Sequence, residues 1–174
     1  MTPHHFTLSD EAVLGFDTNA KMSPPLRSKA DVQEVLRAIE DGTIDAIATD
    51  HAPHHPDRKA VEFEQAPNGV VGLETAVALA LDGLVHGRGL SLTRLVELMS
   101  VNPARILGLD KLDKGRLVEG AEADLTLIDL EREHTVDPER FRSLSRNSPF
   151  KGRRLRGGPV MTIVAGRAVW EAGG

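Results

Sequence analysis

Cysteine is absent from the 174-residue sequence, and aromatic residues make up only 3% of it. Without cysteine the chain can form no disulfide bond and no thiolate zinc site, and it cannot use a cysteine nucleophile. Any metal ion that it binds must therefore be held by histidine, by carboxylates or by other nitrogen and oxygen ligands. This restriction directs attention to the seven histidines of the sequence.

Long apolar runs and a strong positive charge are absent too. The longest apolar stretch, residues 70–85, is interrupted by Glu74 and Asp82 and is too short to span a bilayer. The N-terminal residues lack the basic and apolar regions of a signal peptide. The formal net charge is −5, and the sequence has no basic stripe with interleaved aromatic residues of the kind that binds nucleic acid. We therefore expect a cytoplasmic protein that binds neither membranes nor nucleic acid.

Hydrophobic residues nevertheless make up 40% of the sequence, enough for the core of one modest domain. Apolar residues at helical spacing predict an amphipathic helix over 29–41, which ends at Gly42. The apolar stretch 44–49 is typical of a strand that is covered on both faces, and it ends at Asp50. Three further helices are expected, which cover residues 9–14, 73–85 and 91–109, the last of them broken at Pro103.

The pattern changes after residue 108. Residues 115–130 and 158–174 predict strands joined by glycine-rich turns, with a tight hairpin that has Gly166 in its turn. The sequence thus divides into an α/β part, residues 1–108, and a mostly β part, residues 109–174.

The loop after the predicted strand 44–49 carries the chemistry. It reads "TDHAPHHPD" over residues 49–57 and holds two aspartates and three histidines. In βα architectures functional side chains gather at the C-terminal ends of the strands, where Asp50 lies. A carboxylate there can hold a metal ion or transfer a proton. Spacing alone leaves a second interpretation open, in which the loop is solvated and Asp50 caps the next turn.

Six segments taken together resemble the dihydroorotase family, a branch of the cyclic amidohydrolases. In chain order they are "KMSPPLRS", "ATDHAPHH", "APNGVVGLET", "NPARILGL", "KGRLVEGAEADLTLIDL" and "SRNSPFKGRRLRG". The combination of "TDHAPH" with "PPLR" is specific to this family, whereas "NPARILGL" and the "ADLTLID" segment occur more widely among amidohydrolases. The resemblance covers essentially the whole chain.

The resemblance implies a reaction and a cofactor. Members of the family interconvert N-carbamoyl-L-aspartate and dihydroorotate in pyrimidine biosynthesis, and they hold one or two zinc ions at the mouth of a TIM barrel. Zinc polarises the ring carbonyl and makes hydroxide available at neutral pH. A neighbouring carboxylate carries the proton to the leaving nitrogen. The chain is therefore expected to be a hydrolase acting on cyclic amide C–N bonds.

The resemblance also assigns roles to individual residues. Asp50 matches the carboxylate that is both zinc ligand and general acid/base. The expected substrate-binding residues are Ser23, Arg27, His54, Asn68 and Gly69. Ser23 departs from the family pattern, which often has asparagine at this position, and serine has a shorter reach. Arg27 fits either a bidentate carboxylate contact or a structural ion pair.

The length of the chain limits these expectations. A (β/α)₈ barrel needs about 250 residues and each βα unit roughly 30, so residues 1–108 supply about three units. His4 and His5 are expected to be structural, because the remaining zinc ligands of the family precede this segment. We expect the C-terminal part of a TIM (β/α)₈ barrel of the metal-dependent amidohydrolase type, followed by strands of an incomplete small β-sandwich. Alone, such a chain is expected to be inactive.

Two other functions fit the sequence less closely. One is a related cyclic amidohydrolase, an allantoinase or a hydantoinase. The other is a non-catalytic dihydroorotase-like subunit that scaffolds aspartate transcarbamoylase. The small-molecule substrate is the principal expected partner, and a second copy of the chain in a homodimer or a transcarbamoylase is the expected protein partner.

Overall fold

The computed structural model describes residues 1–173. Helices α1 to α6 cover Pro3–Thr7, Lys29–Glu40, Pro56–Lys59, Ala76–Ala80, Leu92–Val96 and Asn102–Ile106. One antiparallel sheet has the strand order β1-β2-β3, formed by Leu125–Thr135, Arg154–Val164 and Arg167–Glu171. Short 3-10 turns lie at Asp10–Val13, Thr18–Ala20, Leu109–Leu112 and Pro138–Arg140, and π-helical turns at Leu81–His86 and Glu97–Val101. None of the helices in the described part is long and apolar enough to cross a bilayer.

Helix α2 confirms the amphipathic helix predicted over 29–41. Its start is fixed by a capping box, in which the Asp31 backbone N–H donates to Ser28 Oγ at 3.3 Å and the Ser28 N–H donates to the Asp31 carboxylate at 3.1 Å. Leu36 and Ile39 are buried on its inner face. The cap and the apolar face therefore place the end of α2 beside the segment that leads to Asp50.

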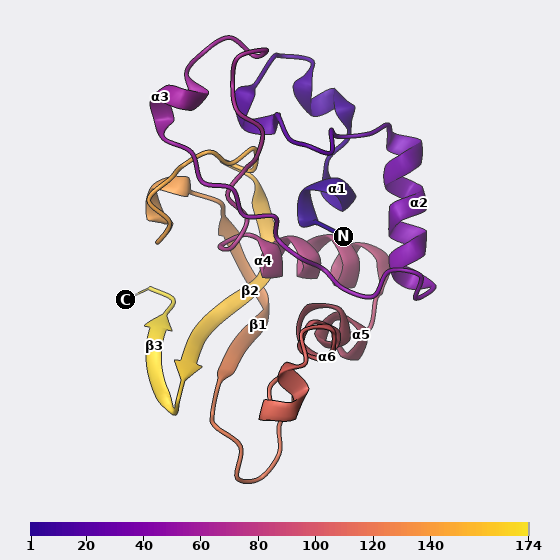
Figure 1. Ribbon diagram of the computed structural model, residues 1–174, viewed down its shortest axis with the longest axis vertical. Coiled ribbons are helices and arrows are strands. Elements are labelled where there is room, and N and C mark those ends of the chain that lie inside the picture. The colour runs from indigo at the N-terminus through magenta and orange to yellow at the C-terminus, as the bar shows by residue number, and fades with distance from the viewer. Residues whose placement is uncertain (174) are drawn as a thin grey trace.

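Helix α4 and the π-helical turn Leu81–His86 form the most deeply buried helical run, as the apolar stretch over 73–85 predicts. Ala80 and Leu81 are completely buried, and Leu79 and Leu84 are 1% exposed. A helix that is apolar on most of its circumference requires neighbours on all sides. Figure 1 shows this helix between α1 and α5 on one side and the sheet on the other.

The helical region that begins at Ser91 differs from expectation at Pro103. Ser91 caps α5, since its Oγ accepts from the Arg94 N–H at 3.1 Å. Pro103 does not break the helix but lies in the first turn of α6. The π-helical turn Glu97–Val101 stands directly before it, and this change of hydrogen-bond register lets the chain stay helical where proline supplies no N–H donor.

Two other local predictions are wrong. Residues 9–14 contain a short 3-10 turn rather than an α-helix, and Ser9 makes no side-chain cap. Residues 44–49 run extended but form no strand ladder, because only scattered backbone bonds reach them. The Ile47 N–H donates to the Leu98 carbonyl and the Ala48 N–H to the Met1 carbonyl, both at 2.9 Å. A strand needs a neighbour with matching register, and the described residues offer none here.

The predicted change to β structure is confirmed by the three-stranded sheet. Strands β2 and β3 pair through Val164 and Arg167 across a two-residue turn that contains Gly166, as the hairpin signature predicts. Strand β2 crosses the central helix closely at Gly157, where a Cβ would lie 3.0 Å from Leu81 side-chain atoms. Gly157 also has a φ of +87°, so glycine is required here on both counts.

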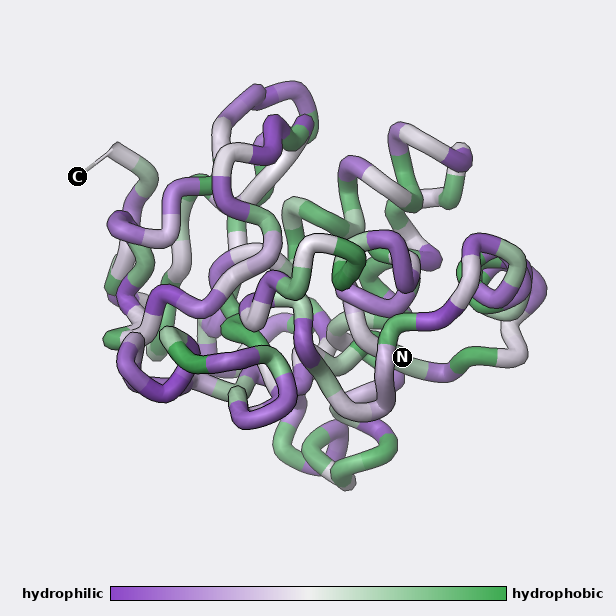
Figure 2. Tube along the Cα trace, turned by 90° about the horizontal axis from the view of Figure 1, so that it is seen from above, coloured by the Kyte–Doolittle hydropathy of each residue, from purple (hydrophilic) through white to green (hydrophobic). Residues whose placement is uncertain are grey.

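Two buried clusters meet at the central helix. One joins Phe6, Leu36 and Leu95 to Leu81 and Leu84 on one face. The other joins Ala78 and Leu79 to residues of the β-rich part, which are Val136, Phe150 and Leu155. Large apolar side chains also stay exposed, and Figure 2 shows hydrophobic stretches on the outside of the molecule as well as in its interior.

The capping box of α2 gives a direct test of the fold. Replacing Ser28 with alanine removes the Oγ acceptor, and we expect the free energy of unfolding to fall by about 1 kcal/mol. Ser9→Ala is the matched control, because Ser9 occupies an N-cap position without a side-chain cap bond. Urea unfolding followed by circular dichroism measures both variants. Equal losses in the two would contradict the capping assignment.

Candidate functional site

Asp50 stands where the extended segment 44–49 turns into the long loop that leads to α4. Its side chain is exposed, and its φ of +50° lies in the left-handed region. Non-glycine residues seldom adopt this conformation, although aspartate is among those that do. Such strain persists only where the surroundings enforce it, and it is concentrated at functional sites. The backbone thus turns sharply at the residue that the sequence analysis places at the centre of the chemistry.

The turn at Asp50 is held by His51. Its backbone forms a parallel bridge with Val70, and its Nδ1 accepts from the Gly72 N–H at 3.1 Å. Because Nδ1 is the acceptor, the ring is committed to the start of the next helix. His51 therefore has a structural role as the orienting residue of the loop.

His54, Asn68 and Gly69, three of the predicted substrate-binding residues, come together on facing loop segments. His54 Nε2 lies 2.8 Å from the Asn68 carbonyl, and the Gly69 N–H donates to the Lys21 carbonyl at 2.9 Å. A carbonyl only accepts, so His54 carries its ring hydrogen on Nε2. The last contact brings residues 68–69 next to the segment that contains Ser23.

Gly69 allows these segments to approach each other. A Cβ on Gly69 would lie 2.5 Å from the Ala52 Cβ and 3.4 Å from His54 Nε2. Its φ of +114° is also unfavourable for any residue with a side chain. The position therefore requires glycine for packing and for backbone conformation.

Ser23 and Arg27 do not join this group through side-chain contacts. Ser23 is exposed, and the loop it belongs to is held by His5, whose Nε2 donates to the Pro24 carbonyl at 2.9 Å. Arg27 lies 3.8 Å from the Asp31 carboxylate in an exposed ion pair. Of the two interpretations of Arg27, the described contacts favour the structural pair.

Two lysines that the sequence analysis did not single out close the far end of the loop. Lys59 Nζ donates to the Thr18 carbonyl at 2.8 Å and to the Pro67 carbonyl at 2.9 Å, and Lys21 Nζ donates to the Phe63 carbonyl at 2.7 Å. Burial lowers the pKa of Lys59 to about 8, an effect that Asp17 opposes and Lys21 reinforces. A lysine in an exposed-looking "DRK" segment gives no sequence signal for such burial.

Asn147 is the other residue that sequence reasoning missed. Its side chain is 4% exposed and reaches the loop from the β-rich part of the chain. Nδ2 donates to the Ala52 carbonyl at 2.9 Å and to the Gly69 carbonyl at 3.1 Å, while Oδ1 accepts from the His54 N–H at 3.2 Å. The "SRNSPF" segment contributed to the family resemblance, but nothing in it indicated contact with residues about 90 positions earlier.

Glu74, at the start of the central helical run, holds the same β-rich segment. Glu74 Oε1 accepts from both the N–H and the Oγ of Ser143 at 2.7 Å. Burial favours the neutral acid, but these hydrogen bonds and the nearby His51 outweigh it and leave the pKa of Glu74 lowered. The carboxylate is therefore charged at neutral pH and serves as an anchor.

The described residues do not by themselves form a zinc site. Within residues 1–173 no group of three or more His, Asp or Glu side chains lies close enough together to hold a metal ion. A protein zinc site needs three or four such ligands. His51 and His54 use ring nitrogens within the loop, and His55 Nδ1 lies 3.4 Å from the Asp57 carboxylate. Asp50 is left as one exposed carboxylate.

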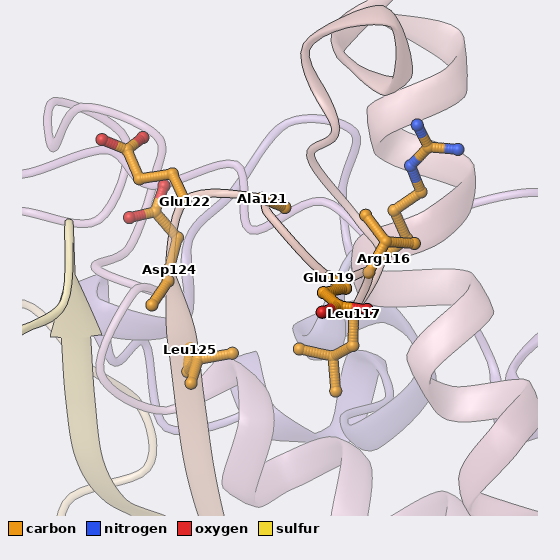
Figure 3. A pocket seen from close by; sticks show the side chains of 9 residues that line it. Arg116, Leu117, Glu119, Ala121, Glu122, Asp124 and Leu125 are labelled. Atoms are coloured by element: carbon orange, nitrogen blue, oxygen red, sulfur yellow. The ribbon is translucent and has the colours of Figure 1, made fainter.

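The cavities lie elsewhere. One, of about 370 Å³, is formed by residues 116–125 and is the concave side of a single loop (Figure 3). A second, of about 570 Å³, lies between the beginning of the central helical run and the sheet and is lined by Glu74, His134 and Trp170, among others. Neither of these two cavities is lined by Asp50 or by the group around His54.

Comparison with known proteins matches residues 9–169 to the model of the amidohydrolase family. The chain is 56% identical over 171 residues to a dihydroorotase of Geobacter sp. (strain M21) and 54% identical over 171 residues to one of Pelotomaculum thermopropionicum. Each alignment covers 98% of this chain but 39% of the relative, so the chain spans about two fifths of the length of these proteins.

Solved structures give the same fold. An L-hydantoinase (dihydropyrimidinase) from Arthrobacter aurescens superposes with a TM-score of 0.93 at 35% identity, covering 99% of this chain and 39% of that one. A D-hydantoinase (dihydropyrimidinase) from Thermus sp. gives a TM-score of 0.88 at 28% identity, covering 98% and 38%. The α/β fold of amidohydrolase type predicted from the sequence is confirmed for the described residues.

Substitution of Gly69 tests the close approach of the two loop segments. In Gly69→Ala the new Cβ cannot be placed without moving Ala52 or the backbone, so we expect a lower thermal midpoint and altered amide signals of His54. Gly83→Ala is the control, because a Cβ at Gly83 meets no atom within 4 Å. Differential scanning calorimetry and ¹H–¹⁵N NMR compare the two. Equal behaviour of both variants would contradict the assignment.

His4 makes stability depend on pH. Its side chain is 2% exposed, and burial, with a smaller contribution from His5, lowers its pKa from 6.5 to about 4. The unfolded chain thus binds more protons than the folded one between these values, so stability falls as the pH drops from 6.5 to 4. The full loss is roughly 3 kcal/mol.

Replacing His4 with glutamine should flatten this part of the stability profile. His55→Gln is the matched control, because the His55 side chain is 71% exposed. Urea unfolding at a series of pH values measures the slopes. A His4→Gln profile as steep as that of the unchanged protein would show that another group causes the acid sensitivity.

Proposed function

The chain belongs to the amidohydrolase family, and on that premise we propose that it is the C-terminal part of a dihydroorotase. Such an enzyme interconverts N-carbamoyl-L-aspartate and dihydroorotate. The observation that carries the proposal is identity of 51–56% to dihydroorotases over nearly the whole chain. The geometry supports it, because Asp50, His54 and Gly69 all lie on or beside one sharply turned loop after the extended segment 44–49.

In the hydrolytic direction water adds to the ring carbonyl carbon and the C–N bond breaks. The water loses a proton, and the leaving nitrogen gains one, so a single group can take up the first and deliver the second. We assign this transfer to Asp50. Its carboxylate is exposed at the end of an extended segment, where the backbone turns sharply.

His54 is proposed to bind an acidic group of the substrate. Its Nε2 hydrogen is already given to the Asn68 carbonyl, so contact with an anion falls to Nδ1. Neutral Nδ1 carries a lone pair, and it must take up a proton before it can donate to a carboxylate. Contact between His54 and an acidic group of the substrate is therefore proposed to be made through Nδ1.

We further propose zinc as the metal, with Asp50 as one ligand and the other ligands outside these 174 residues. The described residues do not fit a complete site, and no chemical step is assigned to the metal here. Residues 1–108 are proposed to be the last βα units of the barrel, and residues 109–174 the β-rich segment of a composite sandwich. We also propose a cytoplasmic location, a homodimer and an aspartate transcarbamoylase as protein partner.

A hydantoinase is the second candidate, favoured by the TM-score of 0.93 to the Arthrobacter aurescens L-hydantoinase. Sequence identity favours the dihydroorotase, because it is 35% to that enzyme and 56% to the Geobacter dihydroorotase. Fold similarity within a family does not by itself fix the substrate. Hydantoin and dihydroorotate are therefore both offered in the experiment.

The experiment tests this chain alone and joined to the preceding part of a longer relative. The isolated chain should neither bind zinc stoichiometrically nor turn over dihydroorotate. A chimera that joins it to the preceding part of the Geobacter sp. (strain M21) relative should be active on dihydroorotate, and Asp50→Asn should reduce kcat by about 10²–10⁴-fold. Asp45→Asn is the matched control, since Asp45 is an exposed aspartate on the same extended segment. Activity of the isolated chain, or preference of the chimera for hydantoin, would refute the proposal.

A further inference from the structure

A buried polar strap runs from the β-rich part of the chain to the candidate site. The strap comprises residues 143–150, and Ser145, Asn147, Ser148 and Phe150 in it are 8%, 4%, 5% and 2% exposed. It has no regular secondary structure over most of its length. Burial of irregular backbone and polar side chains is costly unless their hydrogen bonds are satisfied, so the partners of the strap matter.

Both sides of the strap are anchored independently of Asn147's side chain. On one side, Ser143 donates two hydrogen bonds of 2.7 Å to Glu74. On the other, the Asn147 carbonyl accepts from the Val71 N–H at 3.0 Å. The backbone of Asn147 is thus attached directly to the segment that follows Gly69. The side chain of Asn147 therefore extends from a fixed backbone position.

The side-chain amide of Asn147 then spans the two loop segments of the site. Both Nδ2 hydrogens are used, one on the Ala52 carbonyl and one on the Gly69 carbonyl, and Oδ1 takes the His54 N–H. Asparagine is the side chain that offers two donors and an acceptor at this length. Asp, although of the same shape, would present oxygens to two carbonyls.

Few other contacts hold these segments together. The Ala52 N–H donates to the Val70 carbonyl at 2.9 Å, and the His54 ring reaches the Asn68 carbonyl. The His54–Asn68 contact is exposed, whereas the bond from the Asn147 amide to the Gly69 carbonyl is buried. The amide therefore fixes the backbone on either side of the ring of His54 and sets where that ring lies relative to residues 68–69.

We propose that Asn147 is a positioning residue, which fixes His54 and the Asn68–Gly69 backbone for substrate binding from the β-rich part of the chain. Asn147 is not assigned any contact with the reacting atoms. The inference rests on the proposed function in one respect, namely that the ordered loop binds a substrate. Its geometric content, that one amide orders the loop, can be tested without any activity.

The first test uses the 174-residue chain and NMR. In the unchanged protein the Asn147 side-chain NH₂ should exchange with solvent at least tenfold more slowly than that of Asn68, which is exposed. In Asn147→Asp the backbone amide of His54 should exchange roughly tenfold or more faster, because the loop loses two donors and faces a charge. Rapid exchange of the Asn147 NH₂ in the unchanged protein would overturn the proposal without any variant.

Two further variants separate positioning from general loss of stability. Asn147→Ser keeps a polar group with a shorter reach and should loosen the loop without placing a charge there. Ser148→Ala is the matched control, because Ser148 is equally buried but its Oγ contacts only the Phe150 N–H, at 3.3 Å within the strap. An equal rise in His54 exchange in Ser148→Ala would show that Asn147 acts only through the stability of the strap.

The second test uses the chimera described above. For a positioning residue that sets substrate binding, Asn147→Ser should raise KM for dihydroorotate about tenfold or more while kcat changes little, whereas Ser148→Ala should leave both unchanged. An unchanged KM in an active Asn147→Ser chimera would refute the role in substrate binding. If the unsubstituted chimera is inactive, the proposed function fails, and the exchange measurements still decide whether Asn147 orders the loop.

Discussion

The burial of the central helical run, α4 with the π-helical turn Leu81–His86, is the constraint on which the rest of the structure depends. Its residues are apolar on both faces, and each face completes a different buried cluster. Leu84 packs in the cluster with the other helices, and Ala78 and Leu79 pack in the cluster with the β-rich part, while Leu81 lies in the first cluster and also against β2 at Gly157. Because such a helix is stable only when both faces are covered, the two parts of the chain are held in one arrangement. This packing also fixes the position of the polar loop that precedes the helix.

Order in the polar loop has a different origin. Residues 50–69 contain little apolar surface to bury, and their shape comes from hydrogen bonds that meet backbone carbonyls. Lys59 and Lys21 donate to backbone carbonyls at one end of the loop, and His51 accepts a backbone hydrogen bond at the other end. Asn147 donates to a backbone carbonyl in the middle of the loop. Buried donors of this kind are costly to lose, since each carbonyl they serve would stay unpaired in the interior. The site is therefore rigid where it is bound to the scaffold and exposed at Asp50.

Local patterns predicted local structure well. The helix over 29–41 and the turn at Gly166 each involve residues within a few positions of one another, and each forms as expected. The strand expected over 44–49 fails for the opposite reason, because strand pairing needs a neighbour that sequence pattern cannot supply. The roles of Asn147 and Lys59 were missed on the same ground, since the partners of Asn147 lie 78 to 95 positions away and Lys59 reaches Thr18 across 41 positions. Gly69 was expected only as a substrate-binding residue, and its close approach to Ala52 became evident only in three dimensions.

The division of the chain near residue 108 follows composition, but the contacts cross it. Val136, Phe150 and Leu155 lie in the same buried cluster as Ala78 and Leu79, so either part alone would expose apolar surface that the other now covers. The strap carries the same dependence into the site, because the loop around His54 is completed by a side chain from the β-rich part. A separate sandwich domain beside a barrel would leave the barrel loops to order themselves. Here the β-rich segment is part of the structure that shapes the candidate site, and exchange of that segment between amidohydrolases should change substrate binding as well as stability.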